Sequence, residues 1–468
     1  MAEATGTGPV HADVVADTPT DDTVEPSTYQ IPGLPSSAPS TSRLVSLAQT
    51  IARQTEIVDG YLRDHGGAYP SFEADGPLQF PSLPRKVQQA RQAALEATTE
   101  LKDLITGPAE MVRWMSWDFQ NQTSLSAMNH FKIANSFPVG STATFAEISK
   151  KVNLDEMNVR RLMRHAMTNR IFKEVSPGVV AHTAASRVLA EDAVMQDWVG
   201  TCTEDFYPAS AQVVKALALA PGSQDMTQTG FQLANNTWEQ EPLFVTLGKD
   251  PVRARRFGGS MHSLSNGEGY EPSYLVDHYP WADLDARQAL VVDLGGSHGF
   301  VCKLLAERFP RLRFLVQDLP KMIVSAPSFA GTDLEGRIEF MAHDFMTEQP
   351  VKGADVYFFR WIFHNQPDRH ALNIIQQLIP ALKPGARILI NDHCLPEVGH
   401  ESLWDEKIIR SMDLMMLTLL NAQERSAAEF ETLFRRADAR FRFVGVTRPK
   451  GCRMSIVEAV WEGDGPGE

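Results

Sequence analysis

The segment ALVVDLGGSHG, residues 289–299, carries the clearest indication of the fold class. Its first half is a short continuous apolar run, which is typical of a strand buried on both faces. Its second half holds Gly295, Gly296 and Gly299, and glycines allow a tight turn and a close backbone approach to a ligand. A helical pattern over residues 300–310 follows directly. The order of strand, glycine-rich turn and helix predicts the opening unit of a parallel, doubly wound sheet.

Further apolar runs downstream continue this alternation of strands and helices. Two segments near the end, RFRFVGVTRP and RMSIVEAVWEG, predict a final antiparallel pair. We therefore expect an α/β catalytic domain over residues 281–468, with a Rossmann-like and mostly parallel sheet. The other predicted strands are RFLVQDL (313–319), IEFMAHDF (338–345), ADVYFFRW (354–361) and ARILINDH (386–393).

The chain before this domain has a different pattern. Residues 1–40 are rich in Pro, Ser, Thr, Asp and Gly, which predicts a disordered acidic tail. Apolar residues at helical spacing then predict an all-α domain over residues 41–200 and a helical linker over residues 201–280. Within the first of these, residues 143–190 follow the order helix, turn through Asn153, helix and hairpin, which is typical of a winged helix. Such a module either binds DNA or serves packing and dimerisation, and we favour the second role.

Composition and charge exclude several classes of protein. The 468 residues are 43% hydrophobic, enough for a large folded core. The formal net charge of -14 disfavours a nucleic-acid partner, because phosphates require a basic face. No apolar run reaches the roughly 18 residues of a membrane span, and the N-terminus lacks the apolar core of a secretory signal. The four dispersed cysteines predict neither a disulfide framework nor a zinc site and favour a cytoplasmic setting.

A carboxylate at the end of the second predicted strand adds to the glycine turn. Asp318 lies 19 residues after Gly299 (318 − 299), where a carboxylate can hydrogen-bond two ribose hydroxyls. Alone, this pair indicates a nucleoside-containing ligand, and NAD is one possibility. The turn reads DLGGSHG rather than GxGxxG, however, and an acidic, backbone-lined bend suits a ligand amine better than a pyrophosphate.

Polar residues also stand at the carboxyl ends of the next strands, the edge where ligands bind in open α/β sheets. His364 is a candidate general base, since imidazole titrates near neutrality. Asp392 is placed to hold its tautomer and to stabilise the imidazolium. A histidine after a strand is also often a structural residue, so both interpretations stay open on this pattern alone. The remaining residues at this edge are Asp344, Phe345, Arg360 and Trp361.

Together these motifs resemble those of the S-adenosylmethionine-dependent O-methyltransferases of plant caffeate and flavonoid type. The resemblance is closest to fungal relatives that methylate phenolic polyketides, and it covers roughly residues 43–462. DLGGSHG matches the DxGGGxG loop of that family, and FFRWIFHNQPD matches its (K/R)W-x-x-HDW-x-D signature. The 28-residue interval from His364 to Asp392 (392 − 364) is kept, and NAQERS, with Glu424, matches a GKERT-like motif.

The resemblance implies a role for each matching residue. His364 would remove the phenol proton, flanked by Asp392 and Glu424. Core packing explains Met415 and Met416 as well as a pocket role does. The residues that would bind S-adenosylmethionine are Gly295, Gly296, Asp318, Asp344, Phe345, Arg360, Ser265 and Trp361, the last of these packing on adenine. The acceptor pocket would be lined by Phe257, Met261, Asn365 and Met416.

The chain departs from the family pattern at two points. Asn365 and Gln366 stand where the family has Asp and Trp, so a neutral amide replaces a substrate-facing acid and suggests a different acceptor. Ser297 replaces the third loop glycine. No metal ion is implied, because a base takes the place of a Lewis acid, and we discount the pair Asp392-His393 as part of a metal site. A homodimer formed through the N-terminal helices is a further implication.

The expected reaction is therefore methyl transfer from S-adenosylmethionine to a phenolic hydroxyl of an aromatic secondary metabolite, in particular a polyketide. One alternative is an enzyme of the same fold that keeps the cofactor and catalyses a non-methylating step, such as dehydration or pericyclic cyclisation. Retention of His364, Asp392 and Glu424 together favours methylation. Another alternative, a DNA-binding regulator, would leave the C-terminal half unexplained.

Overall fold

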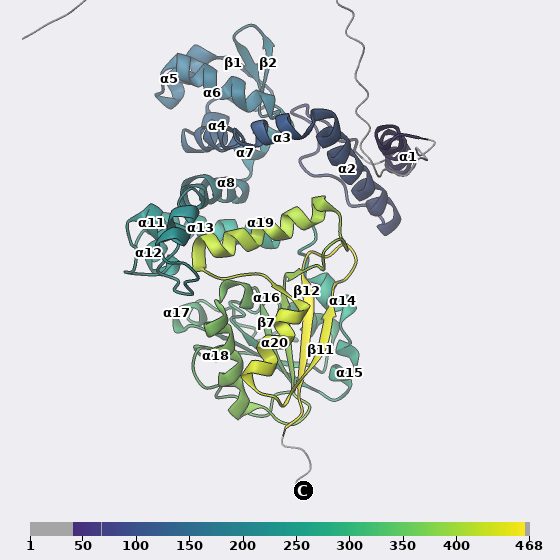
Figure 1. The fold of residues 1–468 in the computed structure, drawn as a ribbon, viewed down its shortest axis with the longest axis vertical. Coiled ribbons are helices and arrows are strands. Elements are labelled where there is room, and N and C mark those ends of the chain that lie inside the picture. Colours follow the sequence, from purple (N-terminus) through teal and green to yellow (C-terminus); the bar gives the residue numbers. More distant parts are fainter. Residues whose placement is uncertain (1–40, 67, 464–468) are drawn as a thin grey trace, which may run out of the picture.

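The computed structural model describes residues 41–66 and 68–463, so the predicted acidic tail over residues 1–40 lies outside the described part. A helical part is followed by a layered α/β part, as the sequence predicts (Figure 1). The sheet lies at one end of the molecule and most of the N-terminal helices lie at the other. Helix α19 (Leu403–Leu420) runs across the molecule between them (Figure 1).

The main sheet of the described residues has seven strands in the order β11-β12-β8-β7-β4-β5-β6. The five central and edge strands from β6 to β8 are parallel, whereas β12 pairs antiparallel with both β8 and β11. The predicted mostly parallel sheet with a final antiparallel pair is confirmed. The strands are β4 (Leu290–Leu294), β5 (Arg313–Asp318), β6 (Ile338–Ala342), β7 (Val356–Arg360), β8 (Arg387–Asp392), β11 (Phe441–Thr447) and β12 (Ser455–Trp461).

Both faces of the sheet are covered, which explains why its strands read as continuous apolar runs. Tyr357 and Phe359 of β7 face the cluster under α18 (Asp368–Leu378) and α20 (Ala427–Ala437). The alternate residue Phe358 faces the cluster under α16 (Phe300–Arg308) on the other side. The order of strands reverses between β4 and β7, so the crevice at the carboxyl ends of these strands is the expected ligand site.

Short helices and turns connect the sheet to its surroundings. Helices α14 and α15 precede β4, and η3 follows β7 directly. The two-residue strands β9 and β10 pair in parallel beside the main sheet. The elements are α14 (Ser273–His278), α15 (Trp281–Ala286), α17 (Pro320–Ile323), η3 (Phe363–Asn365), η4 (Ile379–Ala381), β9 (Cys394–Leu395) and β10 (Arg425–Ser426).

The N-terminal part is built of helices with one small sheet. Helix α1 (Arg43–Asp64) packs along α2 (Arg85–Thr106), and α2 contacts α19. No helix within residues 41–66 and 68–463 combines the length and the apolarity that crossing a membrane requires. The other helices are α3 (Pro108–Met115), α4 (Phe119–His130), η1 (Ile133–Asn135), α7 (Ala184–Glu191), α8 (Ala193–Thr201), η2 (Cys202–Phe206), α9 (Tyr207–Ser210), α10 (Val213–Leu219), α11 (Gly230–Asn235), α12 (Leu243–Gly248) and α13 (Pro251–Ser265).

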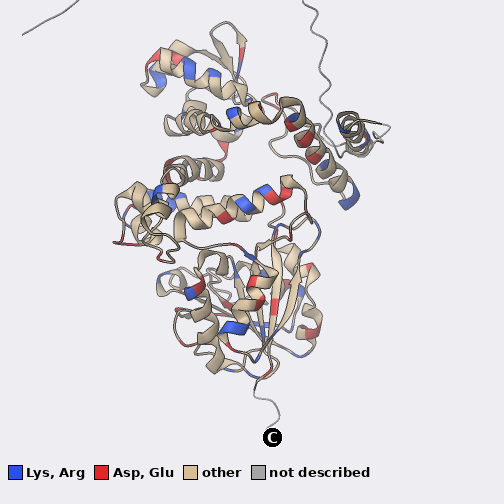
Figure 2. Ribbon diagram, viewed as in Figure 1, with Lys and Arg blue, Asp and Glu red and all other residues tan. Residues whose placement is uncertain are grey.

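Residues 143–190 contain the predicted helix, turn, helix and hairpin. Helix α5 (Phe145–Val152) ends at Asn153 in a left-handed conformation (φ 53°), and Asp155 caps α6 (Glu156–Thr168) through the backbone N–H of Asn158. Strands β1 (Thr142–Thr144), β3 (Val179–Ala181) and β2 (Lys173–Ser176) form a three-stranded sheet in that order. Basic and acidic residues mix in this region (Figure 2). The winged-helix assignment and the domain boundaries stay predictions.

Candidate active site

The glycine turn leaves the carboxyl end of β4 and exposes bare backbone. Gly295 (φ 75°) and Ser297 (φ 53°) adopt left-handed conformations. A Cβ atom on Gly295 would lie 2.5 Å from the side chain of Ile362, and one on Gly296 would lie 2.5 Å from Cγ of Asp293. Real Cβ atoms do not approach other atoms so closely, so both positions require glycine. The turn therefore forms a backbone-lined cradle where the sequence predicts the cofactor.

Asp318 ends β5 and ties the glycine turn to that strand. Its Oδ2 accepts a hydrogen bond from the backbone N–H of Ser297 at 2.9 Å, and its Oδ1 accepts one from Leu319 at 2.7 Å. The first bond supports the left-handed Ser297, which the family pattern has as glycine. Beneath the turn, burial raises the pKa of Asp293 to about 6, although the Cys302 thiol donates to its carboxylate at 3.1 Å.

Of three other predicted cofactor residues, one contacts the glycine turn, and the two others bond to backbone groups near them in the chain. Phe345 lies against the turn, with Cε1 3.5 Å from the Cβ position of Gly295. Asp344 is exposed, and its Oδ1 accepts the N–H of Met346 at 2.9 Å. Ser265 bonds within its own helix, donating to the carbonyl of Met261 at 2.9 Å.

Arg360, at the end of β7, is engaged with protein groups instead. Its Nη2 donates to the backbone carbonyl of Tyr270 at 2.7 Å, and its Nη1 donates to the side chain of Asn391. Burial lowers the pKa of this guanidinium to about 10. Arg360 therefore anchors the segment around Tyr270 to the sheet beside the cradle.

The structure brings His364, Asp392 and Glu424 together from three separate parts of the chain. His364 lies in η3 with 6% of its surface exposed. Its Nδ1 is 3.1 Å from Oε1 of Glu424, and its backbone N–H donates to Oδ2 of Asp392 at 3.1 Å. The backbone N–H of Glu424 donates in turn to Asp413 of α19 at 2.9 Å. Imidazole and carboxylate thus form a hydrogen-bonded pair on a fixed support.

The charges of this pair determine which nitrogen of His364 is free. The pKa of Glu424 is about 2, because both neighbouring imidazoles outweigh the opposing effect of burial. An ionised carboxylate only accepts hydrogen bonds, so Nδ1 of His364 carries the hydrogen and Nε2 carries the lone pair. Burial alone would lower the pKa of His364, but the charge and hydrogen bond of Glu424 raise it above 6.5. Burial raises the pKa of Asp392.

Two further residues of this cluster are not among the predicted site residues. His393 is fully buried, and its Nδ1 lies 3.1 Å from the same Oε1 of Glu424. Its Nε2 lies 3.2 Å from the hydroxyl of Tyr270. The sequence signal for His393 is the dipeptide Asp392-His393 at the end of a strand, which is discounted above as part of a metal site.

Trp361 lies beside both imidazoles. Its ring centroid is 5.0 Å from that of His364 and 5.1 Å from that of His393. Its backbone is left-handed (φ 57°), a conformation that costs a bulky residue energy and that clusters at functional sites. The indole Nε1 is buried and has no hydrogen-bond partner. The predicted packing of this ring on adenine stays a prediction.

Three of the four predicted acceptor residues meet in one apolar cluster. Phe257 and Met261 come from α13, and Met416 comes from α19. Phe206 closes the cluster with its ring edge-to-face on Phe257, the centroids lying 6.4 Å apart. The side chain of the fourth residue, Asn365, donates to the carbonyl of Trp361 at 3.0 Å. Since α19 packs against η3, this cluster lies next to the turn that carries His364.

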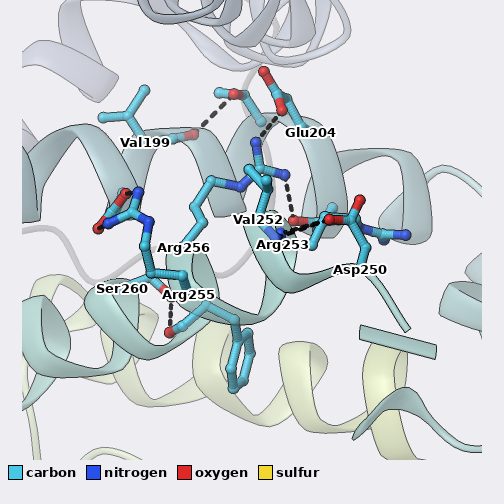
Figure 3. A network of polar contacts seen from close by, with 12 residues as sticks. Val199, Glu204, Asp250, Val252, Arg253, Arg255, Arg256 and Ser260 are labelled. Carbon is cyan, nitrogen blue, oxygen red and sulfur yellow. Dashed lines mark hydrogen bonds and ion pairs between the residues drawn. The ribbon is translucent and has the colours of Figure 1, made fainter. Parts of the chain in front are cut away.

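An ionic network behind the cluster holds α13 against α8 and η2, and Figure 3 shows Arg253 and Arg256 within it. The buried carboxylate of Asp205 accepts from Arg253 Nη2 at 2.6 Å and from Arg256 Nη2 at 2.8 Å. Arg255 binds Asp197 at 2.9 Å. Element η2 is a π-helical turn, a feature found frequently at functional sites. The network fixes the rotation of α13 and thereby the direction of Phe257.

Two adjacent glycines of α13 are expected to respond oppositely to alanine. A Cβ atom on Gly259 would overlap Asp197, with Cγ only 2.9 Å away, whereas one on Gly258 would meet nothing within 4 Å. Gly259→Ala should therefore lower the free energy of unfolding by about 2 kcal/mol through overpacking. Gly258→Ala, the matched control, should raise it by about 0.5–1 kcal/mol through helix propensity. Urea denaturation measures both, and equal effects would contradict the close approach of α8 and α13.

Comparison with known proteins agrees with this geometry. Residues 277–440 match the family model described as an O-methyltransferase domain. A chlorophenol O-methyltransferase of Trichoderma longibrachiatum is 49% identical over 423 residues, which span 90% of this chain and 91% of that protein.

Solved structures show the same fold at lower identity. The crystal structure of OxaC aligns with a TM-score of 0.69 at 23% identity, covering 90% of this chain and all of that one. A structure titled "A Pericyclic Reaction enzyme" aligns with a TM-score of 0.67 at 23% identity, covering 89% of this chain. At such identities the structures establish the fold alone, whereas the relative from Trichoderma shares about half of its residues with this chain. On that similarity, and on the matching domain, the chain belongs to the S-adenosylmethionine-dependent O-methyltransferases.

Proposed function

We infer that the protein methylates a phenolic hydroxyl, with His364 as the general base. The observation that carries this proposal is the hydrogen bond of 3.1 Å between Nδ1 of His364 and Oε1 of Glu424. The other ring nitrogen of His364, Nε2, bonds no other described residue. The apolar cluster around Phe257 and Met416, next to this turn, offers an aromatic acceptor a place to bind. A planar, apolar ring with one ionisable hydroxyl fits both features.

The cradle at the end of β4 fits S-adenosylmethionine. Gly295 and Gly296 leave no room for side chains, so the backbone itself is open to a ligand. Asp318 would accept hydrogen bonds from the ribose hydroxyls. The indole Nε1 of Trp361 is buried without a partner, so its N–H is available to donate a hydrogen bond to the cofactor. Phe345 lies against the same turn. When bound, S-adenosylmethionine supplies an electrophilic methyl group on a sulfonium.

The side chains of His364 and Glu424 would remove the proton of the phenol hydroxyl. A phenol has a pKa of about 10, so little phenolate exists near neutral pH without a positioned base. Nε2 of His364 takes the proton of the hydroxyl. The Nδ1–H group keeps its hydrogen bond to the carboxylate of Glu424, and the negative charge of that carboxylate stabilises the imidazolium. Asp392 holds the backbone of His364 in place through its N–H. Glu424 is thus assigned to the stabilisation of the imidazolium, and Asp392 to the placement of the His364 backbone.

The acceptor is proposed to be a substituted phenol. The name of the Trichoderma relative, a chlorophenol O-methyltransferase, supports this class. Methionine side chains are flexible and adapt to irregular shapes, so the cluster suits a bulky or substituted ring, including a polyketide. The cluster contains Met226, Met261, Met412, Met415 and Met416.

Methyl-labelled S-adenosylmethionine and a panel of substituted phenols, naphthols and anthraquinones test the proposal. Label should appear in a phenol ether, and kcat/KM should rise with pH through a pKa above 6.5, because only the neutral imidazole is a base. In Glu424→Gln the carboxylate charge is lost, so this limb should move to lower pH. Cofactor binding without label transfer to any acceptor would favour the non-methylating alternative.

We also propose a homodimer formed through the N-terminal helices. None of the residues of α3 is buried, although the helix and the turn after it carry large apolar side chains. Sedimentation velocity should show a species of twice the chain mass, which the double substitution Trp114→Ser, Trp117→Ser should convert to monomer. A monomeric wild type at micromolar concentration would contradict this proposal. The exposed side chains are Val112, Trp114, Met115, Trp117 and Phe119.

The cytoplasmic location stays a proposal as well. It is supported by the cysteines at four separate positions, all of which are free thiols.

A further inference from the structure

One oxygen of Glu424 serves two imidazoles. Oε1 lies 3.1 Å from Nδ1 of His364 and 3.1 Å from Nδ1 of His393, while Oε2 is buried without a partner. A carboxylate oxygen has two lone pairs and can accept both hydrogen bonds. The two donors therefore share one acceptor atom, although a free oxygen exists on the same carboxylate.

The hydrogen positions on His393 follow from its two partners. The ionised carboxylate requires a hydrogen on Nδ1, which leaves the lone pair on Nε2. The hydroxyl of Tyr270, 3.2 Å away, then donates to Nε2. Both nitrogens of His393 are thus hydrogen-bonded, and the ring is fully buried. His364 differs, because its outer nitrogen has no such cap.

Several charged or titratable groups surround His364, and they come from β8 and the residue after it, from α19, from β10 and the residue before it, and from the loop of Tyr270. The negative charges are those of Glu424 and Asp392, and a positive charge on Arg425 opposes them. His393 is the only one of these groups in contact with both Glu424 and the ring of Trp361. The complete set is Glu424, Asp392, Asp413, Arg425, His393 and Tyr270.

We propose that His393 is a positioning residue of the proposed base, His364. His393 shares Oε1 of Glu424 with His364, and this second hydrogen bond weakens the attraction of the carboxylate for the proton on His364. A carboxylate that accepts a second hydrogen bond spreads its charge over two donors and attracts each of them less. His364 then releases its proton more easily after each turnover. This inference rests on the proposed role of His364 as the base.

The test follows the protonation of His364 without requiring turnover. An imidazolium quenches the fluorescence of an indole in contact with it, and Trp361 lies 5.0 Å from His364. The emission of Trp361 is obtained by subtracting the spectrum of Trp361→Phe, and it is followed from about pH 5 to about pH 9. His364→Ala should abolish the titration, which establishes that His364 is its source.

Three variants then separate the hydrogen bond from packing. His393→Leu removes the second donor, and the midpoint should rise by about one pH unit. His393→Asn keeps an N–H on the same Cγ, facing Glu424, and should return the midpoint close to that of the wild type. Tyr270→Phe leaves the bond to Glu424 in place and should change the midpoint little. The acid limb of kcat/KM should move in parallel with the fluorescence midpoint.

An unchanged midpoint in His393→Leu, or an equal shift in His393→Asn, would overturn the proposal. If the leucine variant does not fold, His393→Met replaces it, because methionine fills irregular space. A wild type that titrates as described but methylates no phenol would refute the proposed function while leaving the role of His393 standing.

Discussion

Replacing His364 with alanine is expected to lower methyl transfer to a phenol of ordinary acidity by about a thousandfold, a typical contribution of a general base. A phenol with a pKa of about 10 is almost entirely protonated at neutral pH, so the variant must wait for the rare phenolate. A phenol that carries enough electron-withdrawing substituents to be ionised at neutral pH needs no base. For such an acceptor, the rate should fall by less than about tenfold.

The comparison uses one enzyme, one cofactor and two acceptors that differ in acidity and little in size. Label transfer from methyl-labelled S-adenosylmethionine gives both rates, and calorimetry should show unchanged cofactor affinity in His364→Ala. An equal loss with both acceptors would mean that His364 positions the ring rather than removing a proton. Chlorinated phenols are suitable acidic acceptors, because electron-withdrawing chlorine atoms lower the pKa of the hydroxyl.

Gly296→Ala is expected to weaken the binding of S-adenosylmethionine at least a hundredfold. Its Cβ atom would lie 2.5 Å from Cγ of Asp293, a carboxylate that is 3% exposed and cannot move aside into solvent. The turn must therefore shift away from β4, and the hydrogen bond from Ser297 to Asp318 would stretch with it. Overpacking of this kind also costs about 1–3 kcal/mol of stability.

Gly248→Ala is the matched control, because this exposed glycine at the end of α12 has nothing within 4 Å of its Cβ position. Isothermal titration calorimetry measures cofactor affinity in both variants, and thermal unfolding with and without cofactor measures the stability change. If Gly296→Ala bound the cofactor as tightly as Gly248→Ala, the glycine turn would not be the cofactor cradle.

Much of the fold and part of the site could be predicted from local patterns. The apolar run before Gly295 identified a buried strand, and parallel strands bring their carboxyl ends to one edge, so Asp318 was expected near the turn. The pairing of His364 with Glu424 spans 60 residues. It was expected only because the family motifs resemble those of this chain, since no spacing rule connects a turn after β7 to a residue after α19.

The contact of His393 with Glu424 could not be predicted for a geometric reason. Successive side chains of a strand point to opposite faces, so Asp392 and His393 are expected on different sides of the sheet. The strand β8 ends at Asp392, however, and the alternation ends with it. Both residues therefore bond to the pair formed by His364 and Glu424. Tyr270 was missed as well, because it lies in an irregular loop whose position depends on Arg360 and not on any periodic pattern.

Helix α19 contributes both to the lining of the apolar cluster and to the placement of Glu424, so neither can change independently of the other. Met412, Met415 and Met416 contribute to the apolar cluster, and the intervening Asp413 holds the backbone of Glu424 at 2.9 Å. A change of α19 that enlarges the cluster is expected to move Asp413 as well, and with it the backbone of Glu424. With the proposed function, new acceptor preferences in this lineage are therefore expected to arise through α13, whose Phe257 and Met261 line the same cluster.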